Sequence, residues 1–327
     1  MAQTLPIAVR VRAPGKINVA LSVGPLREDG YHDLATVFLA VSLYEEVAAW
    51  PARGFTVTYG GSVDTSMLTG DDTLVHRAAR LVAAELSAEQ RAVWGIGEGG
   101  VPGVHIAVEK HVPIAGGMGG GSADAAATLL ACNALWNVGL GKERLWELAA
   151  TLGADVPFAL QGGTALGLGR GDELTPVLAG GTFHWVLVPN ETGLSTPAVY
   201  RELDRLRAEH VVPNPDRAAV APEVMTALRS GSASGLRDAL HNDLQAAAFS
   251  LAPELETRVR QFNLHRDAMV TLVSGSGPTL AILAPDQIAA RMLVADLRAQ
   301  GLGAIEVVGP VHGAHFVHEP DEDDLLA

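Results

Sequence analysis

The chain has 327 residues, a length that suits about two domains or one large one. Hydrophobic residues make up 48 % of it and charged residues 18 %, which excludes a disordered chain and indicates a sizeable core. The 37 acidic and 23 basic side chains leave a net charge of −14, which argues against nucleic acid or an anionic membrane as a partner, because attraction to phosphate requires a basic field.

The first 160 residues are predicted to form one domain. Alternation of apolar and polar side chains predicts strands there, and Pro14 with Gly15 is expected to break the first of them. The stretch 87–103 is rich in glycine and proline and has no period, so it is predicted to be a surface loop. The expected strands cover residues 7–12, 17–23, 36–47 (as a pair) and 104–112, and the expected helices cover residues 73–86, 122–137 and 142–152.

The remaining residues, 161–327, are predicted to form a second domain of strands and helices. Glycines punctuate its strands, and a glycine-rich turn at 274–278 separates two of them. From about residue 318 the sequence HEPDEDDLLA is typical of a solvated acidic tail. The expected strands cover residues 164–178, 183–189 and 268–274, with one more after the turn, and the expected helices cover residues 197–209, 222–241, 253–263 and 286–300.

A glycine-dense loop is the strongest local signal of function. It reads PIAGGMGGG, follows the strand over 104–112 and leads into an alanine-rich helix. Glycines let the backbone approach a ligand and turn its N–H groups toward one point, and the following helix adds a partial positive charge there. These features predict a polyphosphate site, with Ser122 capping the helix or meeting a phosphate or a metal ion. The residues expected to form the site are Pro113, Ile114, Ala115, Gly116, Gly117, Met118, Gly119, Gly120, Gly121, Ser122 and Ala123.

Two other phosphate-binding motifs do not fit this loop. The dinucleotide fingerprint G-x-G-x-x-G would need glycine where Ser122 stands. A Walker A motif would need serine or threonine after Gly-Lys, and the two Gly-Lys pairs are followed by Ile17 and Glu143. The remaining alternative is that the loop is only a flexible turn.

Three segments together resemble the GHMP small-molecule kinases. Residues 13–18 (APGKIN) resemble the first motif of that family, the glycine loop its second and residues 274–279 (SGSGPT) its third, in the expected order along most of the chain. The resemblance implies a two-domain α+β fold, with a left-handed β-α-β unit in the N-terminal domain and a ferredoxin-like C-terminal domain. It also implies ATP and Mg²⁺ as cofactors and an active site in the cleft between the domains.

Other strings are similar to one branch of that family, whose substrate is a cytidine diphosphate ester. These strings are residues 30–32 (GYH), 153–158 (GADVPF), 196–200 (TPAVY) and 242–244 (NDL). The branch implies transfer of the γ-phosphate of ATP to the 2-hydroxyl of 4-diphosphocytidyl-2-C-methyl-D-erythritol, in non-mevalonate isoprenoid precursor biosynthesis. Thr73, Ala123 and Arg201 depart from its pattern, because an asparagine, a second serine and a lysine are usual there. The departure at Thr73 concerns a contact on the adenine side of ATP.

The resemblance also implies roles for particular side chains. Asp155 and Lys16 are the candidate catalytic residues: a nearby ammonium favours the ionised carboxylate and steadies the moving phosphoryl charge. Either Asp155 takes the proton of the acceptor hydroxyl fully, or Lys16 mainly lowers the pKa of that hydroxyl; the sequence leaves both open and identifies no metal ligand. The candidate substrate-binding residues are Asn18 for oxygens near Lys16, Tyr31 and Tyr200 for stacking on cytosine, His32 for the polar edge of that ring, and Arg201 for the diphosphate or ribose.

Two rival functions remain open. One is a GHMP kinase that acts on homoserine or a mevalonate derivative, against which Tyr31 and His32 argue. The other is a non-catalytic nucleotide sensor of the same fold, against which the presence of both Lys16 and Asp155 argues.

Cellular location and partners follow from simpler features. The single cysteine, Cys132, favours a reducing compartment, and the sequence shows neither a membrane-spanning apolar run nor a secretion signal. We therefore expect a cytoplasmic protein, a monomer or weak homodimer, with a small-molecule cytidine diphosphate substrate and no nucleic-acid or membrane partner.

Overall fold

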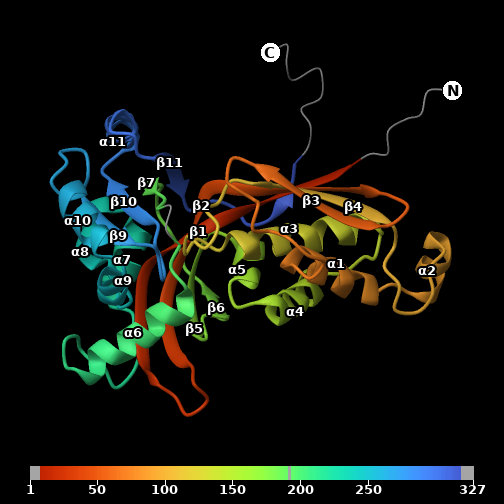
Figure 1. Ribbon diagram of the computed structural model, residues 1–327, viewed down its shortest axis with the longest axis horizontal. Helices are drawn as coiled ribbons and strands as arrows, with labels where there is room; N and C mark the ends of the chain where they lie inside the picture. Colours follow the sequence, from red (N-terminus) through yellow and green to blue (C-terminus); the bar gives the residue numbers. More distant parts are fainter. Residues whose placement is uncertain (1–7, 191–192, 318–327) are drawn as a thin grey trace.

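The computed structural model of the protein describes residues 8–190 and 193–317, which form two β-sheets arranged along the long axis of the molecule (Figure 1). The larger sheet has eight strands and the smaller sheet has four. The predicted acidic tail, 318–327, lies outside the described residues. Among the helices of those residues, none is both long enough and apolar enough to cross a bilayer.

Two long antiparallel strands, β1 (Val9–Leu26) and β2 (His32–Pro51), form the centre of the larger sheet. The predicted break at Pro14 and Gly15 is wrong, because β1 runs through both residues and only the pairing register shifts between them. Such an irregularity tolerates a residue that lacks an N–H group, and so the strand continues. The strand pair predicted over 36–47 is likewise one continuous part of β2.

A β-α-β unit extends this sheet on one side of β2. β4 (Val104–Lys110) pairs with β2, and β3 (Phe55–Gly61) pairs with β4 in parallel. Parallel neighbours require a crossover, and the chain between them contains α1 (Leu74–Ala84). This helix lies within the one predicted over 73–86.

A second helix in the crossover, α2 (Ala88–Trp94), corrects the prediction of a surface loop over 87–103. The Ser87 hydroxyl accepts a hydrogen bond from the Gln90 N–H, and the Gln90 side chain accepts one from the Ser87 N–H. This capping box satisfies two N–H groups at the start of the helix, so a short helix forms in a stretch without an apolar period.

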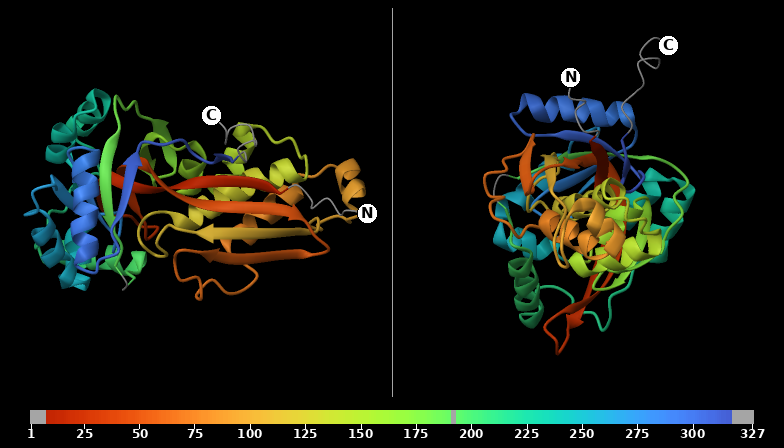
Figure 2. Two further views of the ribbon diagram at one scale, coloured as in Figure 1. Left: turned by 90° about the horizontal axis from the view of Figure 1, so that it is seen from above. Right: turned by 90° about the vertical axis from the view of Figure 1, so that its right-hand side faces the viewer.

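Helices cover one face of the larger sheet (Figure 2). They are α1, α3 (Gly120–Leu135), α4 (Lys142–Leu152) and α5 (Val156–Gln161). The helix predicted over 142–152 is confirmed, and the one predicted over 122–137 begins two residues earlier, at Gly120. Buried aliphatic side chains fill the space between these helices and the sheet, and this core fixes the start of α3 and of α5 relative to β1.

Cys132 is buried completely in α3. Burial raises the pKa of its thiol, because a thiolate would lose its hydration there. We expect the native protein to react with a thiol reagent such as DTNB only as fast as it unfolds, and the thiol to react at once in guanidinium chloride. Rapid titration of the thiol in the native protein would contradict this burial.

Strands from later in the chain complete the larger sheet. β5 (Thr164–Gly169) pairs with β2, and β6 (Glu173–Pro176) pairs with β5. β8 (His241–Asn242) and β12 (His315–Phe316) both pair with β1. The domain boundary near residue 160 stays a prediction, and the chain beyond that residue contributes four strands to the larger sheet.

The smaller sheet is antiparallel, with the strand order β11-β7-β10-β9. Its strands are β7 (Phe183–Val188), β9 (Val270–Val273), β10 (Leu280–Ala284) and β11 (Ile305–Gly309). Helices connect β7 to β9 and β10 to β11, which is the ferredoxin-like arrangement, so that prediction is confirmed. The helices beside this sheet include α9 (Gln245–Leu251), α10 (Pro253–Phe262) and α11 (Gln287–Ala299). α6 (Thr196–Ala208) packs instead against α9 and the end of β1.

The helix predicted over 222–241 is two helices, α7 (Pro222–Ser230) and α8 (Ala233–Ala239). Gly231 separates them, because its φ of 68° is left-handed and ends α7. The sequence did not predict α9.

Candidate active site

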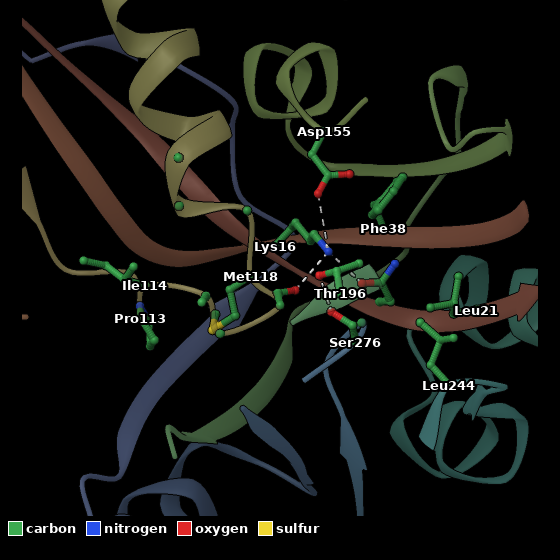
Figure 3. A pocket seen from close by; sticks show the side chains of 18 of the residues that line it. Lys16, Leu21, Phe38, Pro113, Ile114, Met118, Asp155, Thr196, Leu244 and Ser276 are labelled. Carbon is green, nitrogen blue, oxygen red and sulfur yellow. Dashed lines mark hydrogen bonds and ion pairs between the residues drawn. The ribbon is translucent and has the colours of Figure 1, made fainter. Parts of the chain in front are cut away.

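A cavity of about 490 Å³ lies where the loop before α3 meets β1 and the turn after β9 (Figure 3). The three segments singled out in the sequence contact one another at this cavity. The N–H of Lys16 donates to the carbonyl oxygen of Met118 at 2.9 Å, and the Ser274 hydroxyl donates to that of Gly117 at 3.4 Å. Tertiary folding therefore assembles one site from segments that are far apart along the chain.

The glycine loop lines this cavity with nine residues, 113–121. Gly117 and Gly119 have φ values of 76° and 72°, which favour glycine. A Cβ atom on Gly117 would also lie 2.1 Å from the carbonyl oxygen of Ser274, so no other residue fits there. These glycines bring the loop backbone, with its N–H groups, to the surface of the cavity.

α3 begins at the cavity, with Gly119 as its N-cap and no side-chain cap. The prediction that Ser122 caps this helix is wrong, because the left-handed Gly119 starts the helix earlier and Ser122 falls in its first turn. Ser122 and Ala123 do not line the cavity. A helix start without a side-chain cap leaves N–H groups and the positive end of the helix dipole available for an anion.

Lys16 and Asp155 meet beside this loop (Figure 3). Lys16 Nζ lies 3.6 Å from Asp155 Oδ2 and donates hydrogen bonds of 2.9 Å to Asn18 Oδ1 and to the carbonyl oxygen of Gly117. The side chain of Lys16 is 10 % exposed and that of Asp155 is 32 % exposed, so the ammonium is held in place while the carboxylate remains open to the cavity. The structure therefore brings the two predicted catalytic residues close together.

Asn18 connects this pair to the sheet. Its Nδ2 donates to Thr36 Oγ1 at 2.7 Å, and the Thr36 hydroxyl donates to the carbonyl oxygen of Ala20 at 2.8 Å. These bonds orient the amide so that its oxygen faces Lys16. Asn18 therefore holds the ammonium and also lines the cavity.

Tyr200 and His32 form a second group, of which Tyr200 lines the cavity and His32 lies beside that tyrosine without lining it. Their ring centroids are 5.3 Å apart, and His32 Nε2 lies 2.8 Å from Asp204 Oδ1. Tyr200 lines the cavity, and burial, with a smaller effect of the Asp155 charge, raises the pKa of its phenol. The Asp204 contact fixes the orientation of the imidazole under the tyrosine ring.

Two other predicted substrate residues lie farther out. Tyr31, in the hairpin between β1 and β2, is 51 % exposed, and Arg201 is on the exposed side of α6. Neither lines the cavity in the structure.

The turn after β9 is held by two contacts that sequence reasoning did not anticipate. Asn242 Nδ2 donates 2.8 Å hydrogen bonds to the carbonyl oxygens of Val273 and Gly275, and the hydroxyls of Thr196 and Ser276 are 2.8 Å apart. Asn242 and Thr196 both come from strings that the sequence singled out, although it assigned them no partner.

A buried charge cluster beneath the loop was also missed. Lys110 Nζ lies 2.6 Å from both Glu45 Oε1 and Asp124 Oδ2, and Glu45 is completely buried. Burial and the neighbouring Asp124 charge raise the pKa of Glu45 to about 7, against the opposing effect of Lys110. The sequence did contain a signal for this cluster. Lys110 in β4 and Asp124 in α3 are charged residues at positions that otherwise carry apolar side chains.

This cluster predicts how stability depends on pH. Glu45 keeps a proton in the folded protein that the unfolded chain releases from about pH 4.5, so the free energy of unfolding falls as pH rises toward about 7. We expect the melting temperature of the wild type to fall more between pH 5 and pH 8 than that of Glu45→Gln. Glu46→Gln, at the exposed neighbouring position, is the control and should keep the wild-type slope. Equal slopes for Glu45→Gln and the wild type would contradict this account.

Two family models match the chain: the GHMP kinases N terminal domain over residues 73–163 and the GHMP kinases C terminal model over residues 224–301. A 4-diphosphocytidyl-2-C-methyl-D-erythritol kinase from Clavibacter michiganensis subsp. michiganensis is 53 % identical over 320 residues, covering 97 % of this chain and 98 % of its own. The protein of that name from Mycolicibacterium smegmatis is 47 % identical over 317 residues, covering 96 % and 94 %.

Solved structures agree with the predicted fold. A crystal structure of 4-(cytidine 5'-diphospho)-2C-methyl-D-erythritol kinase has a TM-score of 0.69 and 33 % identity, covering 92 % of this chain and 99 % of its own. Homoserine kinase from Cytophaga hutchinsonii has a TM-score of 0.66 at 18 % identity, covering 97 % and 99 %, a likeness of fold alone. The predicted two-domain GHMP kinase fold is confirmed, and the chain belongs to the GHMP kinases, within the family of 4-diphosphocytidyl-2-C-methyl-D-erythritol kinases.

Proposed function

We propose that this protein transfers the γ-phosphate of ATP to the 2-hydroxyl of 4-diphosphocytidyl-2-C-methyl-D-erythritol, a step of non-mevalonate isoprenoid precursor biosynthesis. Relatives of about the same length and near 50 % identity carry the name of this activity. The observation that carries the proposal is the 3.6 Å approach of Lys16 Nζ to Asp155 Oδ2, beside an uncapped helix start in one cavity. That is the charge arrangement that phosphoryl transfer to an alcohol requires.

The glycine loop is the proposed site for the phosphates of ATP. Its backbone comes to the cavity surface at residues 113–121, and α3 directs its dipole there. Ser122 and Ala123 would act through their backbone in the first turn of α3. Because the loop is held by Lys16 and Ser274, its N–H groups are oriented before the nucleotide arrives.

Mg²⁺ is part of the proposal. The Asp155 carboxylate gives the cavity a negative charge, which fits a cation that the ATP phosphates themselves would hold. When bound, the ion would supply positive charge to the phosphate oxygens.

Lys16 and Asp155 are the proposed catalytic residues. The Asp155 carboxylate receives the proton of the 2-hydroxyl as the hydroxyl oxygen attacks the γ-phosphorus, while the bond from that phosphorus to the bridging oxygen breaks and ADP leaves. The Lys16 ammonium stabilises charge on the transferred group, and its bonds to Asn18 and Gly117 keep it in position without reorganisation.

The cytidine end of the substrate is proposed to bind beside Tyr200 and His32. The Tyr200 ring, tilted against that of His32, offers a face to cytosine, and the contact of His32 with Asp204 leaves the second imidazole nitrogen to read the polar edge of the base. Tyr31 and Arg201 would join this site from the neighbouring hairpin and from α6, and Asn18 would meet substrate oxygens near Lys16.

The proposal also covers the cellular location of the protein, its oligomeric state and its partners. We place the protein in the cytoplasm, where ATP is available and a single buried thiol stays reduced. Residues of one chain form the whole cavity described here, so a monomer or weak homodimer suffices for the reaction, with neither nucleic acid nor membrane as partner.

The test is an assay of ADP release with ATP, Mg²⁺ and one acceptor at a time. We expect turnover with 4-diphosphocytidyl-2-C-methyl-D-erythritol and competitive inhibition by CDP against that acceptor. Preferred turnover of homoserine or mevalonate would replace the proposed substrate. Tight ATP binding without ADP release from any acceptor would indicate a nucleotide sensor.

A further inference from the structure

Arg170 is a cation at the cavity that the mechanism above does not use. It stands on the turn between β5 and β6 and lines the cavity. The glycines on either side, Gly169 and Gly171, have φ values of 64° and 92°, and Asp172 Oδ1 accepts a hydrogen bond from the Arg170 N–H at 3.2 Å. A well-defined turn therefore holds this arginine at the edge of the site.

This turn lies on the acceptor side of the cavity. A Cβ atom on Gly171 would lie 3.6 Å from Phe38 Cζ, and Lys16 Nζ lies 5.5 Å from the centroid of the same ring. In Figure 3 Phe38 stands on the opposite side of Lys16 from Pro113 and Ile114 of the glycine loop. One aromatic ring thus separates the Arg170 turn from the catalytic ammonium, away from the proposed ATP phosphates.

In the described part of the chain, two other cations line the cavity, Lys16 and Lys110, and each has a carboxylate partner, whereas Arg170 does not. Lys16 lies beside Asp155, and Lys110 is held between two carboxylates. Within residues 8–190 and 193–317, the guanidinium of Arg170 forms no ion pair with a carboxylate. Its Cζ lies instead 4.4 Å from the centroid of the Tyr31 ring. Stacking uses the face of a guanidinium, and its N–H donors, which lie in the plane, remain available to an anion.

We propose that Arg170 binds the diphosphate of the cytidine diphosphate ester, an inference that rests on the proposed function. A guanidinium fork matches two phosphate oxygens at once, and Tyr31 supports its face while it does so. The resemblance assigned this role to Arg201, which lies outside the cavity lining, whereas Arg170 lines it. By fixing the diphosphate, Arg170 positions the 2-hydroxyl near Asp155 and acts as a substrate-positioning residue.

The experiment compares CDP with cytidine as competitive inhibitors against the ester substrate, in the wild type and in Arg170→Gln. We expect Arg170→Gln to raise the Ki of CDP and the KM of the ester by about tenfold or more, since a hydrogen-bonded charge pair with phosphate is lost. The Ki of cytidine and the KM of ATP should stay within about twofold, and Arg170→Lys should recover part of the CDP affinity.

Arg53→Gln is the matched control, because Arg53 is another exposed turn arginine and does not line the cavity. An unchanged Ki of CDP in Arg170→Gln would overturn the proposal. An equal loss of affinity for cytidine and CDP would also overturn it, since Arg170 would then act on the base through Tyr31. Failure of the wild type to bind CDP or to turn over the ester would be a separate result, and it would remove the proposed function as well.

Discussion

Replacing Asp155 by asparagine is expected to lower kcat by two or more orders of magnitude, with the Kd of ATP nearly unchanged. Asparagine keeps the size of the side chain but cannot take the proton of the acceptor hydroxyl. It also removes the negative charge that lies 3.6 Å from Lys16 Nζ, so the ammonium loses its ion-pair partner and keeps its neutral ones, Asn18 and Gly117. Steady-state ADP release and calorimetric titration with a non-hydrolysable ATP analogue would measure the two quantities.

Asp238→Asn is the control for this variant, because Asp238 is exposed on α8 and, among the described residues, forms an ion pair with its neighbour Arg237 alone. It should keep the wild-type kcat and Kd. Turnover of Asp155→Asn close to that of the wild type would remove Asp155 from the mechanism. It would leave Lys16, by lowering the pKa of the hydroxyl, as the main contributor.

The second large effect concerns the glycine loop. Gly121→Val is expected to raise the Kd of ATP at least about tenfold while the melting temperature stays near that of the wild type. Of the residues that the structure describes, a Cβ atom on Gly121 would contact Leu74 alone, at 3.5 Å, and the backbone there is not left-handed. The added methyl groups therefore disturb the cavity, which Gly121 lines, more than they disturb the fold. Calorimetric titration and thermal melting measure both outcomes.

Gly121 is a better probe than its neighbour Gly120, where a Cβ atom would lie 2.8 Å from Glu45 Oε1 and disturb the buried charge cluster. Gly141→Val is the matched control, because Gly141 precedes α4 with open space around it and an extended backbone. An unaltered Kd of ATP in Gly121→Val would count against the assignment of the phosphate site to this loop.

Much of the architecture was accessible from local patterns. The apolar residues on one face of 73–86 predicted the helix that α1 forms, because one face of a surface helix must be buried. The density of glycine between a strand and an alanine-rich helix predicted a backbone that approaches a ligand, and residues 113–121 line the cavity. Both signals depend only on neighbouring residues, and so they can be read without knowledge of the fold.

The errors arose where specific contacts between residues outweighed the preference expected from composition and from single residues. Pro14 and Gly15 would end an isolated strand, but β1 continues through them because β2 pairs with it on both sides of the irregularity. The helix α2 formed against the glycine-rich composition of 87–103, because Ser87 and Gln90 satisfy each other's backbone groups. Composition counts residues and does not record such reciprocal contacts.

The sequence by itself determined the family, the order of the motifs and the residue types of the site. Only the tertiary structure decided which side chains meet. It brought Lys16 of β1 to Asp155 at the start of α5, placed Lys110 between two buried carboxylates, and put Arg170 at the cavity while Arg201 lies outside it. The physical reason is that these contacts cross between strands and helices far apart in the chain, and their geometry is set by sheet register and core packing rather than by local conformational preference.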